Sequence, residues 1–141
     1  MKIHNQIGPY FQSAKGVRQG DSMSPTLFNM AAECLSKMVR NAQKNGLIVG
    51  MAPDLIEKGV AILQYADDTV ICLDHNFDSA LNVKLLLYMF GLMSRLKINY
   101  TKSEIYLVGG DNIIAETYVD MFGCRVGMLP LQYLGMLVSF R

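Results

Sequence analysis

The stretch QYADDT at 64–69 places two adjacent acids, Asp67 and Asp68, between two short apolar runs. The flanking segments, 60–63 and 70–73, consist mainly of residues that favour β-strands, so the pattern predicts a tight β-hairpin with the acids at its tip. Adjacent carboxylates repel each other, and a divalent cation such as Mg²⁺ is the commonest partner that neutralises them. A second interpretation stays open, because Asp also suits the backbone geometry of a plain turn.

The composition of the 141-residue chain suits one domain with a real core. Hydrophobic residues make up 51% of it and charged residues 18%, so we expect some apolar surface to meet something outside this chain. The net charge of +1 lacks the basic excess of a free-standing nucleic-acid binder. No apolar run is long enough for a membrane span and the N-terminus has no signal-peptide core, so we expect an intracellular protein without a membrane partner.

Three cysteines, Cys34, Cys72 and Cys124, lie far apart and form no C-x-x-C pair. This spacing predicts reduced core thiols rather than zinc ligands or a disulfide framework.

The order of predicted elements mixes strands and helices. We expect a strand, a turn and a second short strand within 1–15, then a helix from Pro25 to about Lys44 with Ser24 as its N-cap, and a short strand at 47–49. The hairpin follows. After it we expect a helix that is capped by Asp78 or Ser79 and ends near Leu96, a strand at 105–108, a helix at about 112–122, and a strand or hairpin at 131–138. This order favours an α+β fold.

Helical spacing of apolar residues predicts which face of each long helix is buried. For the first helix these are Leu27, Ala31, Cys34, Leu35 and Met38, and for the second Leu81, Leu85, Tyr88, Leu92 and Leu96. The glycine-bearing loop at 16–25 leads into the first helix. This loop either binds a phosphate or the edge of a nucleotide, or it is a plain loop that caps the helix.

Four segments in this order resemble the successive palm motifs of reverse transcriptases. They are GDSMSP at 20–25, YADD at 65–68, LKINYTKS at 96–103 and YLG at 133–135. The resemblance looks closest to the LINE-type, non-LTR retrotransposon enzymes of plants and covers about 6–135. It implies an α+β fold that is part of a polymerase palm, with an antiparallel sheet around the hairpin and helices packed on one face. Residues 1–141 would be a partial reverse transcriptase domain.

The resemblance also implies a role for particular residues in RNA-directed DNA synthesis. Asp67 is expected to bind the two catalytic Mg²⁺ (or Mn²⁺) ions, with Asp68 as its supporting carboxylate, in nucleotidyl transfer from a dNTP to a primer 3′-end. Lys102 would protonate or screen the leaving pyrophosphate, and its alternative is a solvated loop lysine.

The nucleic-acid partners implied are an RNA template and a DNA primer. Arg18, Gln19 and Gly20 would contact the template and incoming nucleotide, and Tyr65 would pack near the primer end. Tyr133, Leu134 and Gly135 would grip the primer strand, although Tyr133 is also explained as a position in a plain core strand.

The chain departs from the family pattern at three places. Ser22-Met23 stands where the family usually has Pro-Leu, and Arg95 stands where it usually has Gly. If that Gly needs a positive φ, Arg95 is strained or the turn is rebuilt. Residues 1–20 contain no Asp or Glu, whereas the family supplies a further catalytic aspartate from an upstream strand.

We therefore expect that aspartate, the fingers and the thumb to lie outside this chain, and the chain alone to be inactive. Binding of metal would need another acid, for which Asp21 and Asp74 are the candidates. An alternative is a non-catalytic retrotransposon remnant that acts as an interaction protein, and a less favoured one is another palm-fold enzyme such as a nucleotide cyclase. Family analogy predicts a location in the nucleus and cytoplasm.

Overall fold

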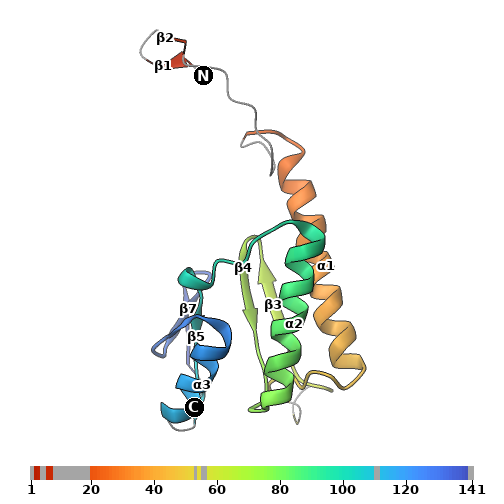
Figure 1. Ribbon diagram of the computed structural model, residues 1–141, viewed down its shortest axis with the longest axis vertical. Coiled ribbons are helices and arrows are strands. Elements are labelled where there is room, and N and C mark those ends of the chain that lie inside the picture. The colour runs from red at the N-terminus through yellow and green to blue at the C-terminus, as the bar shows by residue number, and fades with distance from the viewer. Residues whose placement is uncertain are drawn as a thin grey trace.

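The computed structural model describes residues 2–3, 6–7, 20–52, 54, 57–109 and 112–139 (Figure 1). Its elements in chain order are β1 (Lys2–Ile3), β2 (Gln6–Ile7), α1 (Ser24–Lys44), β3 (Ile62–Tyr65), β4 (Asp68–Ile71), α2 (Phe77–Ser94), the 3₁₀-helix η1 (Tyr100–Lys102), β5 (Glu104–Ile105), α3 (Asn112–Phe122), β6 (Arg125–Val126), β7 (Leu131–Tyr133) and β8 (Met136–Val138). This mixture of helices and short strands confirms the predicted α+β class.

The core lies between the two long helices and one face of the β3–β4 hairpin (Figure 1). Ile62 of β3 is buried there and Ile71, its cross-strand neighbour in β4, packs against the same cluster. Because side chains alternate along a strand, Leu63 and Tyr65 project from the other face, and both are exposed. Both long helices therefore lie on the face of the hairpin that carries Ile62 and Ile71. The buried cluster comprises Leu35, Val39, Ala42, Ile48, Ala61, Ile62, Val83, Leu87 and Phe90.

The strands pair as four separate two-stranded sheets in the described part of the chain, and not as the one antiparallel sheet that we predicted. β1–β2, β3–β4 and β7–β8 are antiparallel, whereas β5 and β6 pair in parallel. The predicted strand at 47–49 does not form. Its central residue, Ile48, is 1% exposed and instead anchors a loop to the core.

The start of α1 corrects the predicted cap. Met23 is the N-cap and Ser24 is already helical, whereas we expected Ser24 to cap the helix. Asp21 closes a turn just ahead of the helix: its carbonyl accepts from the Ser24 N–H over 3.1 Å, and its carboxylate accepts from the Met23 N–H over 3.1 Å. The Asp21 turn thus satisfies backbone donors that a serine cap would otherwise serve.

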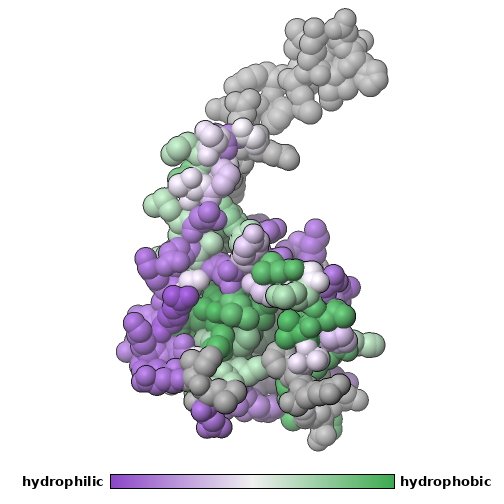
Figure 2. Space-filling model, turned by 180° about the vertical axis from the view of Figure 1, so that it is seen from behind, coloured by the Kyte–Doolittle hydropathy of each residue, from purple (hydrophilic) through white to green (hydrophobic). Residues whose placement is uncertain are grey.

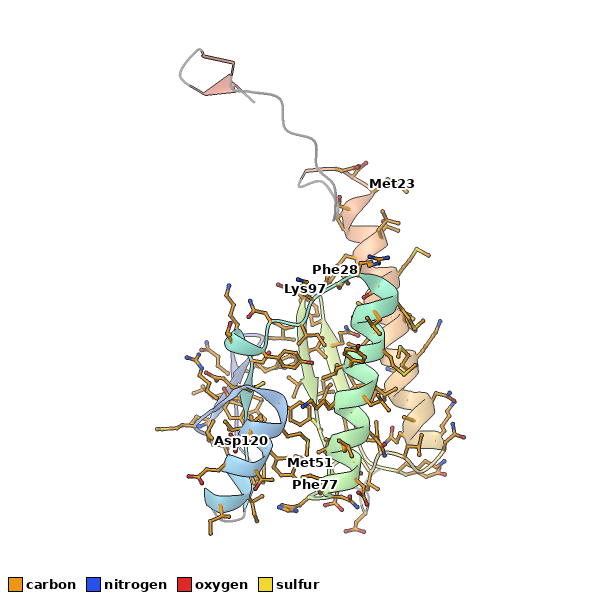
Figure 3. All side chains as sticks on the ribbon, in the orientation of Figure 1. Met23, Phe28, Met51, Phe77, Lys97 and Asp120 are labelled. Atoms are coloured by element: carbon orange, nitrogen blue, oxygen red, sulfur yellow. The ribbon has the colours of Figure 1, made fainter. Side chains whose placement is uncertain are left out.

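The N-terminal half of α1 extends beyond the packed body, and Figure 3 shows Met23 at its far end. Leu27, which we expected to be buried, is 48% exposed, and Cys34 is also exposed rather than a core thiol. Leu35 and Met38 pack in or against the core as predicted. The apolar stripe is therefore buried only along the second half of the helix.

The cap of α2 is Asn76, and not Asp78 or Ser79 as predicted. Asn76 has an extended backbone, and its side-chain oxygen accepts from the N–H groups of Asp78 (2.8 Å) and Ser79 (3.3 Å). Asn, Asp and Ser are all favoured at the N-cap position of a helix. The spacing of the apolar residues therefore did not show which of the three caps α2.

The buried face of α2 was predicted wrongly. Val83, Leu87 and Phe90 enter the core. Of the residues predicted to be inward, only Leu96 packs against it; Leu81, Leu85, Tyr88 and Leu92 are 50%, 56%, 63% and 60% exposed. The helix carries large apolar residues on both sides, so their periodicity did not indicate which side packs.

Arg95 ends α2 in the left-handed conformation, with a φ of 62°. The family usually has glycine here, and the positive φ shows that the turn keeps the conformation that suits glycine. This conformation costs a residue with a Cβ roughly 1–2 kcal/mol. Of the two alternatives, a strained Arg95 or a rebuilt turn, the positive φ favours the strained Arg95.

We expect Arg95→Gly to raise the free energy of unfolding by about 1 kcal/mol, because it relieves this conformational cost. Urea denaturation followed by circular dichroism measures the change. Arg95→Ala is the matched control, since it also removes the guanidinium but keeps the Cβ. Equal stabilisation by both variants would show that the arginine charge, and not the backbone, is the source of strain.

Candidate active site

Asp67 and Asp68 lie at the tip of the β3–β4 hairpin, as predicted. Tyr65 and Asp68 pair across the strands, so Ala66 and Asp67 form a two-residue turn in which Ala66 has a φ of 50°. Both carboxylates are exposed, and Tyr65 is 64% exposed. Because directly opposite residues share a face, Asp68 and Tyr65 project from the face of the hairpin that carries no helix.

A chain of side-chain hydrogen bonds fixes the other face of the hairpin against α1. Ser36, which is buried on α1, donates from its hydroxyl to the Gln64 side-chain oxygen over 2.5 Å. The Gln64 amide nitrogen then donates to the Thr69 hydroxyl of β4 over 3.3 Å. These contacts tie both strands to the helix close to the tip, so the two acids are presented on a supported turn.

A shallow groove of about 270 Å³ runs along the helix side of this hairpin. It is lined by Asn29, Ala32, Glu33, Ser36, Arg40, Ile62, Gln64 and Ala66. We did not predict this groove from the sequence, because its polar residues come from α1 and β3 and meet only in the folded chain. It places Arg40 beside the hairpin, but on the side opposite to Tyr65 and Asp68.

Two adjacent carboxylates supply some of the oxygen ligands that a divalent cation prefers. Across residues 20–52, 54, 57–109 and 112–139, however, no group of three or more His, Cys, Asp or Glu side chains could hold a metal ion. Asp74 lies beyond the far end of β4, where its N–H donates to the Val49 carbonyl over 3.0 Å. Neither Asp74 nor Asp21 therefore completes the site. The hairpin acids fit a metal only with further ligands, such as nucleotide phosphates, water or other carboxylates.

The loop residues predicted to contact nucleotide and template are described only in part. Gly20 is exposed and has a φ of 85°, a conformation that favours glycine. Arg18 and Gln19 lie outside the described residues.

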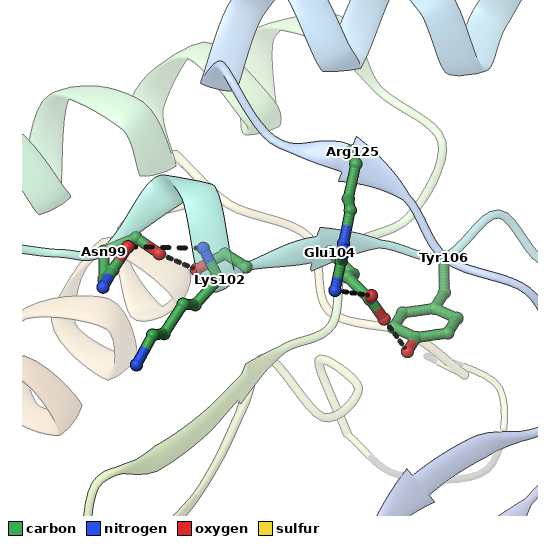
Figure 4. Close-up of polar contacts among 6 residues, drawn as sticks. Asn99, Lys102, Glu104, Tyr106 and Arg125 are labelled. Carbon is green, nitrogen blue, oxygen red and sulfur yellow. Dashed lines mark hydrogen bonds and ion pairs between the residues drawn. The ribbon is translucent and has the colours of Figure 1, made fainter.

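Lys102 ends η1, in which Asn99 caps the turn by accepting from the Lys102 N–H over 3.3 Å (Figure 4). Its ammonium group is exposed and has no hydrogen-bond or ion-pair partner among the residues that the structure describes. This environment suits both the leaving-group role and the solvated lysine that we kept as its alternative.

The predicted primer-gripping residues form the tip of the β7–β8 hairpin. Leu134 and Gly135 have φ values of 52° and 77°, the pattern of a type I′ turn, and Tyr133 is half-buried. No hydrogen bond, ion pair or ring contact between described residues links Tyr133 or Lys102 to Asp67 or Asp68. The structure thus confirms the predicted hairpin at 62–71, and at 131–138 it selects a hairpin over a single strand.

An ion pair that sequence reasoning missed holds β5 next to β6, directly after Lys102. Arg125 contacts the Glu104 carboxylate at 2.7 Å, and the Tyr106 hydroxyl donates to the other carboxylate oxygen (Figure 4). The Tyr106 hydrogen bond, followed by the Arg125 charge, lowers the pKa of Glu104 below its usual value. The same hydrogen bond raises the pKa of Tyr106. No pattern in the sequence signals this contact, because it depends on the parallel pairing of β5 and β6.

Comparison with known proteins decides the family. Residues 2–138 match the family described as reverse transcriptase (RNA-dependent DNA polymerase). The chain belongs to the reverse transcriptase family. It is also 39% identical, over 56 residues, to an uncharacterized mitochondrial protein of Arabidopsis thaliana. That match covers 40% of this chain and 46% of the Arabidopsis protein, so the chain spans about half the length of this curated relative.

Reverse transcriptases generally use divalent metal ions and bind an RNA template, a primer and dNTPs. The matched region includes both hairpin acids, Lys102 and the β7–β8 tip. Among the helices that the structure describes, none is long and apolar enough to cross a bilayer.

The Glu104 network makes the stability of this reverse transcriptase chain depend on pH. Since the folded-state pKa of Glu104 lies below its unfolded value, the network stabilises the fold above about pH 4.5 and loses this contribution as the pH falls through the folded pKa. Urea denaturation between about pH 6 and pH 3 measures the loss. Glu104→Gln should flatten part of this pH dependence, and an unchanged slope would contradict the assignment.

Proposed function

We propose that this chain is part of the palm of a LINE-type reverse transcriptase, in which the β3–β4 hairpin presents carboxylates for nucleotidyl transfer. One observation carries the proposal. Asp67 and Asp68 are exposed at the tip of a hairpin whose opposite face is fixed to α1, within a region matched by the reverse transcriptase family. Adjacent acids on a supported turn are suited to metal-dependent phosphoryl chemistry.

In this proposal Asp67 binds the catalytic Mg²⁺ (or Mn²⁺), and Asp68 supports it. The metal supplies charge neutralisation for the nucleotide phosphates and activation of the primer 3′-hydroxyl. Tyr65 shares its face with Asp68, so this face of the hairpin is the side on which the primer end would lie. Lys102 supplies a positive charge for the leaving pyrophosphate.

The remaining contacts with substrate follow from the same proposal. Arg18, Gln19 and Gly20 contact template and incoming nucleotide, and the tip formed by Tyr133, Leu134 and Gly135 holds the primer. The nucleus and cytoplasm are the proposed location by family analogy. The match to a protein named as mitochondrial adds mitochondria as a compartment to examine.

We further propose that the isolated chain does not catalyse DNA synthesis. The two hairpin acids have no third metal-binding side chain beside them within the described residues. Two mutually repelling carboxylates without that help bind Mg²⁺ weakly. Exposed apolar faces on α1 and α2 favour, as a second candidate, an interaction protein derived from a retrotransposon.

Calorimetric titration tests the incomplete site. We expect the chain to bind Mg²⁺ with an affinity in the millimolar range or weaker, because the hairpin tip supplies only two carboxylates. Asp67→Asn should leave this weak binding unchanged. Tight binding that is lost in the variant would show that another acid of this chain completes the site, and our proposal of inactivity would be wrong.

A chimera tests the polymerase role of the hairpin directly. In an active member of the family, residues 62–71 of this chain would replace the corresponding hairpin, so that the host supplies the remaining ligands. We expect primer extension on an RNA template to stay within about tenfold of the host enzyme, and Asp67→Asn in the chimera to lower it by at least about 100-fold.

Thr69→Ser is the matched control in that chimera, since Thr69 lies next to the acids but faces α1. We expect it to change primer extension only slightly. If the Asp67→Asn chimera copied RNA as well as the unsubstituted chimera, Asp67 would have no catalytic role.

A further inference from the structure

One exposed face of α2 carries large side chains that are three and four residues apart. Leu81, Leu85, Tyr88 and Leu92 form its middle and are each at least half exposed. Asp78 continues the same spacing at one end. At the other end Arg95 follows at the same interval in sequence, but it is the C-cap residue just beyond α2, with a φ of 62°; both charged residues are exposed. We name these six residues the α2 seam. Alternating steps of three and four are the spacing with which two helices pack side by side along their length.

The α2 seam faces away from the core of the described chain. It lies on the side of α2 away from the residues that enter the core, which are Val83, Leu87 and Phe90. The Asp78 carboxylate and the Arg95 guanidinium have no ion-pair partner among the described residues. An apolar stripe with an unpaired charge of opposite sign at each end therefore faces outward.

The pattern of the seam is symmetric about a point midway between residues 85 and 88. If two identical helices cross this point antiparallel and related by a two-fold axis, Leu85 faces Tyr88 of the second copy and Leu81 faces Leu92. Asp78 then lies level with the C-terminal end of the second helix, where the long side chain of Arg95 extends from the C-cap, so an ion pair forms at each end of the seam. A parallel arrangement would instead place Asp78 against Asp78 and Arg95 against Arg95, where like charges repel.

From this complementarity we propose that the α2 seam is a dimer interface, in which α2 packs antiparallel against α2 of a second copy. The contact is isologous, so it closes with two copies and does not propagate. Helix α2 has 18 residues and is about 27 Å long, so the contact is smaller than a standard protein interface. The dimer is accordingly weak and reversible. The proposal depends on α2 alone and does not rest on the proposed polymerase function.

Sedimentation equilibrium of the 141-residue chain tests the proposal. We expect a reversible monomer–dimer equilibrium between about 1 and 100 μM, a range that suits an interface of this size. Leu85→Glu places a charge at the centre of the seam and should raise the dissociation constant at least about tenfold. Met93→Glu is the matched control, because Met93 is 67% exposed on the same helix but lies off the seam.

A charge swap tests the antiparallel geometry and does not depend on the Leu85 variant remaining folded. Asp78→Lys and Arg95→Glu should each weaken the dimer, and the double variant should restore it, because the two charges face each other only in the antiparallel pair. A chain that is monomeric throughout this range would overturn the proposal. So would a dimer weakened equally by Leu85→Glu and Met93→Glu, or a double variant no tighter than the single ones.

Discussion

Burial of one face of the β3–β4 hairpin against two helices organises the described part of this chain. Val39 and Ile48 are almost completely buried, and they share the cluster with Ile62, Val83 and Phe90. Each such side chain contributes roughly 1.5–3 kcal/mol when it is removed from water. Since neighbouring residues in a strand point to opposite faces, burying Ile62 and Ile71 sends Tyr65 and Asp68 to the other side. The position of the candidate active site is thus a consequence of core packing.

Much of this arrangement could be predicted from the sequence, where the local pattern allows one solution. Two β-favouring runs around a short polar centre give a hairpin, and its turn residues, Ala66 and Asp67, follow from the lengths of the two runs. At 131–138 the sequence left a strand and a hairpin open, and the structure shows a hairpin that turns at Leu134 and Gly135. Arg95 is a further case, because it follows a helix at a position where the family usually has glycine, and that position indicates a positive φ.

Other features were mispredicted because they depend on partners distant in the sequence. The apolar residues of α2 surround the helix, so only tertiary packing selects Val83, Leu87 and Phe90 for the core and leaves Leu85 outside. The contact between Glu104 and Arg125 requires the parallel pairing of β5 and β6, which no local pattern specifies. The groove beside Arg40 arises in the same way, from the docking of β3 on α1.

The two outward-facing features of the chain lie on opposite sides of the hairpin. Figure 2 shows the molecule from behind the view of Figure 1. On this side, apolar and hydrophilic residues gather in separate patches. Asp68 and Tyr65 project from the hairpin face without helices, whereas the α2 seam points away from the core that covers the other face. Pairing of two copies through α2 would therefore leave Asp67 and Asp68 accessible in both. An interface on this helix and a metal-dependent site on the hairpin are compatible in one molecule, because the core separates them.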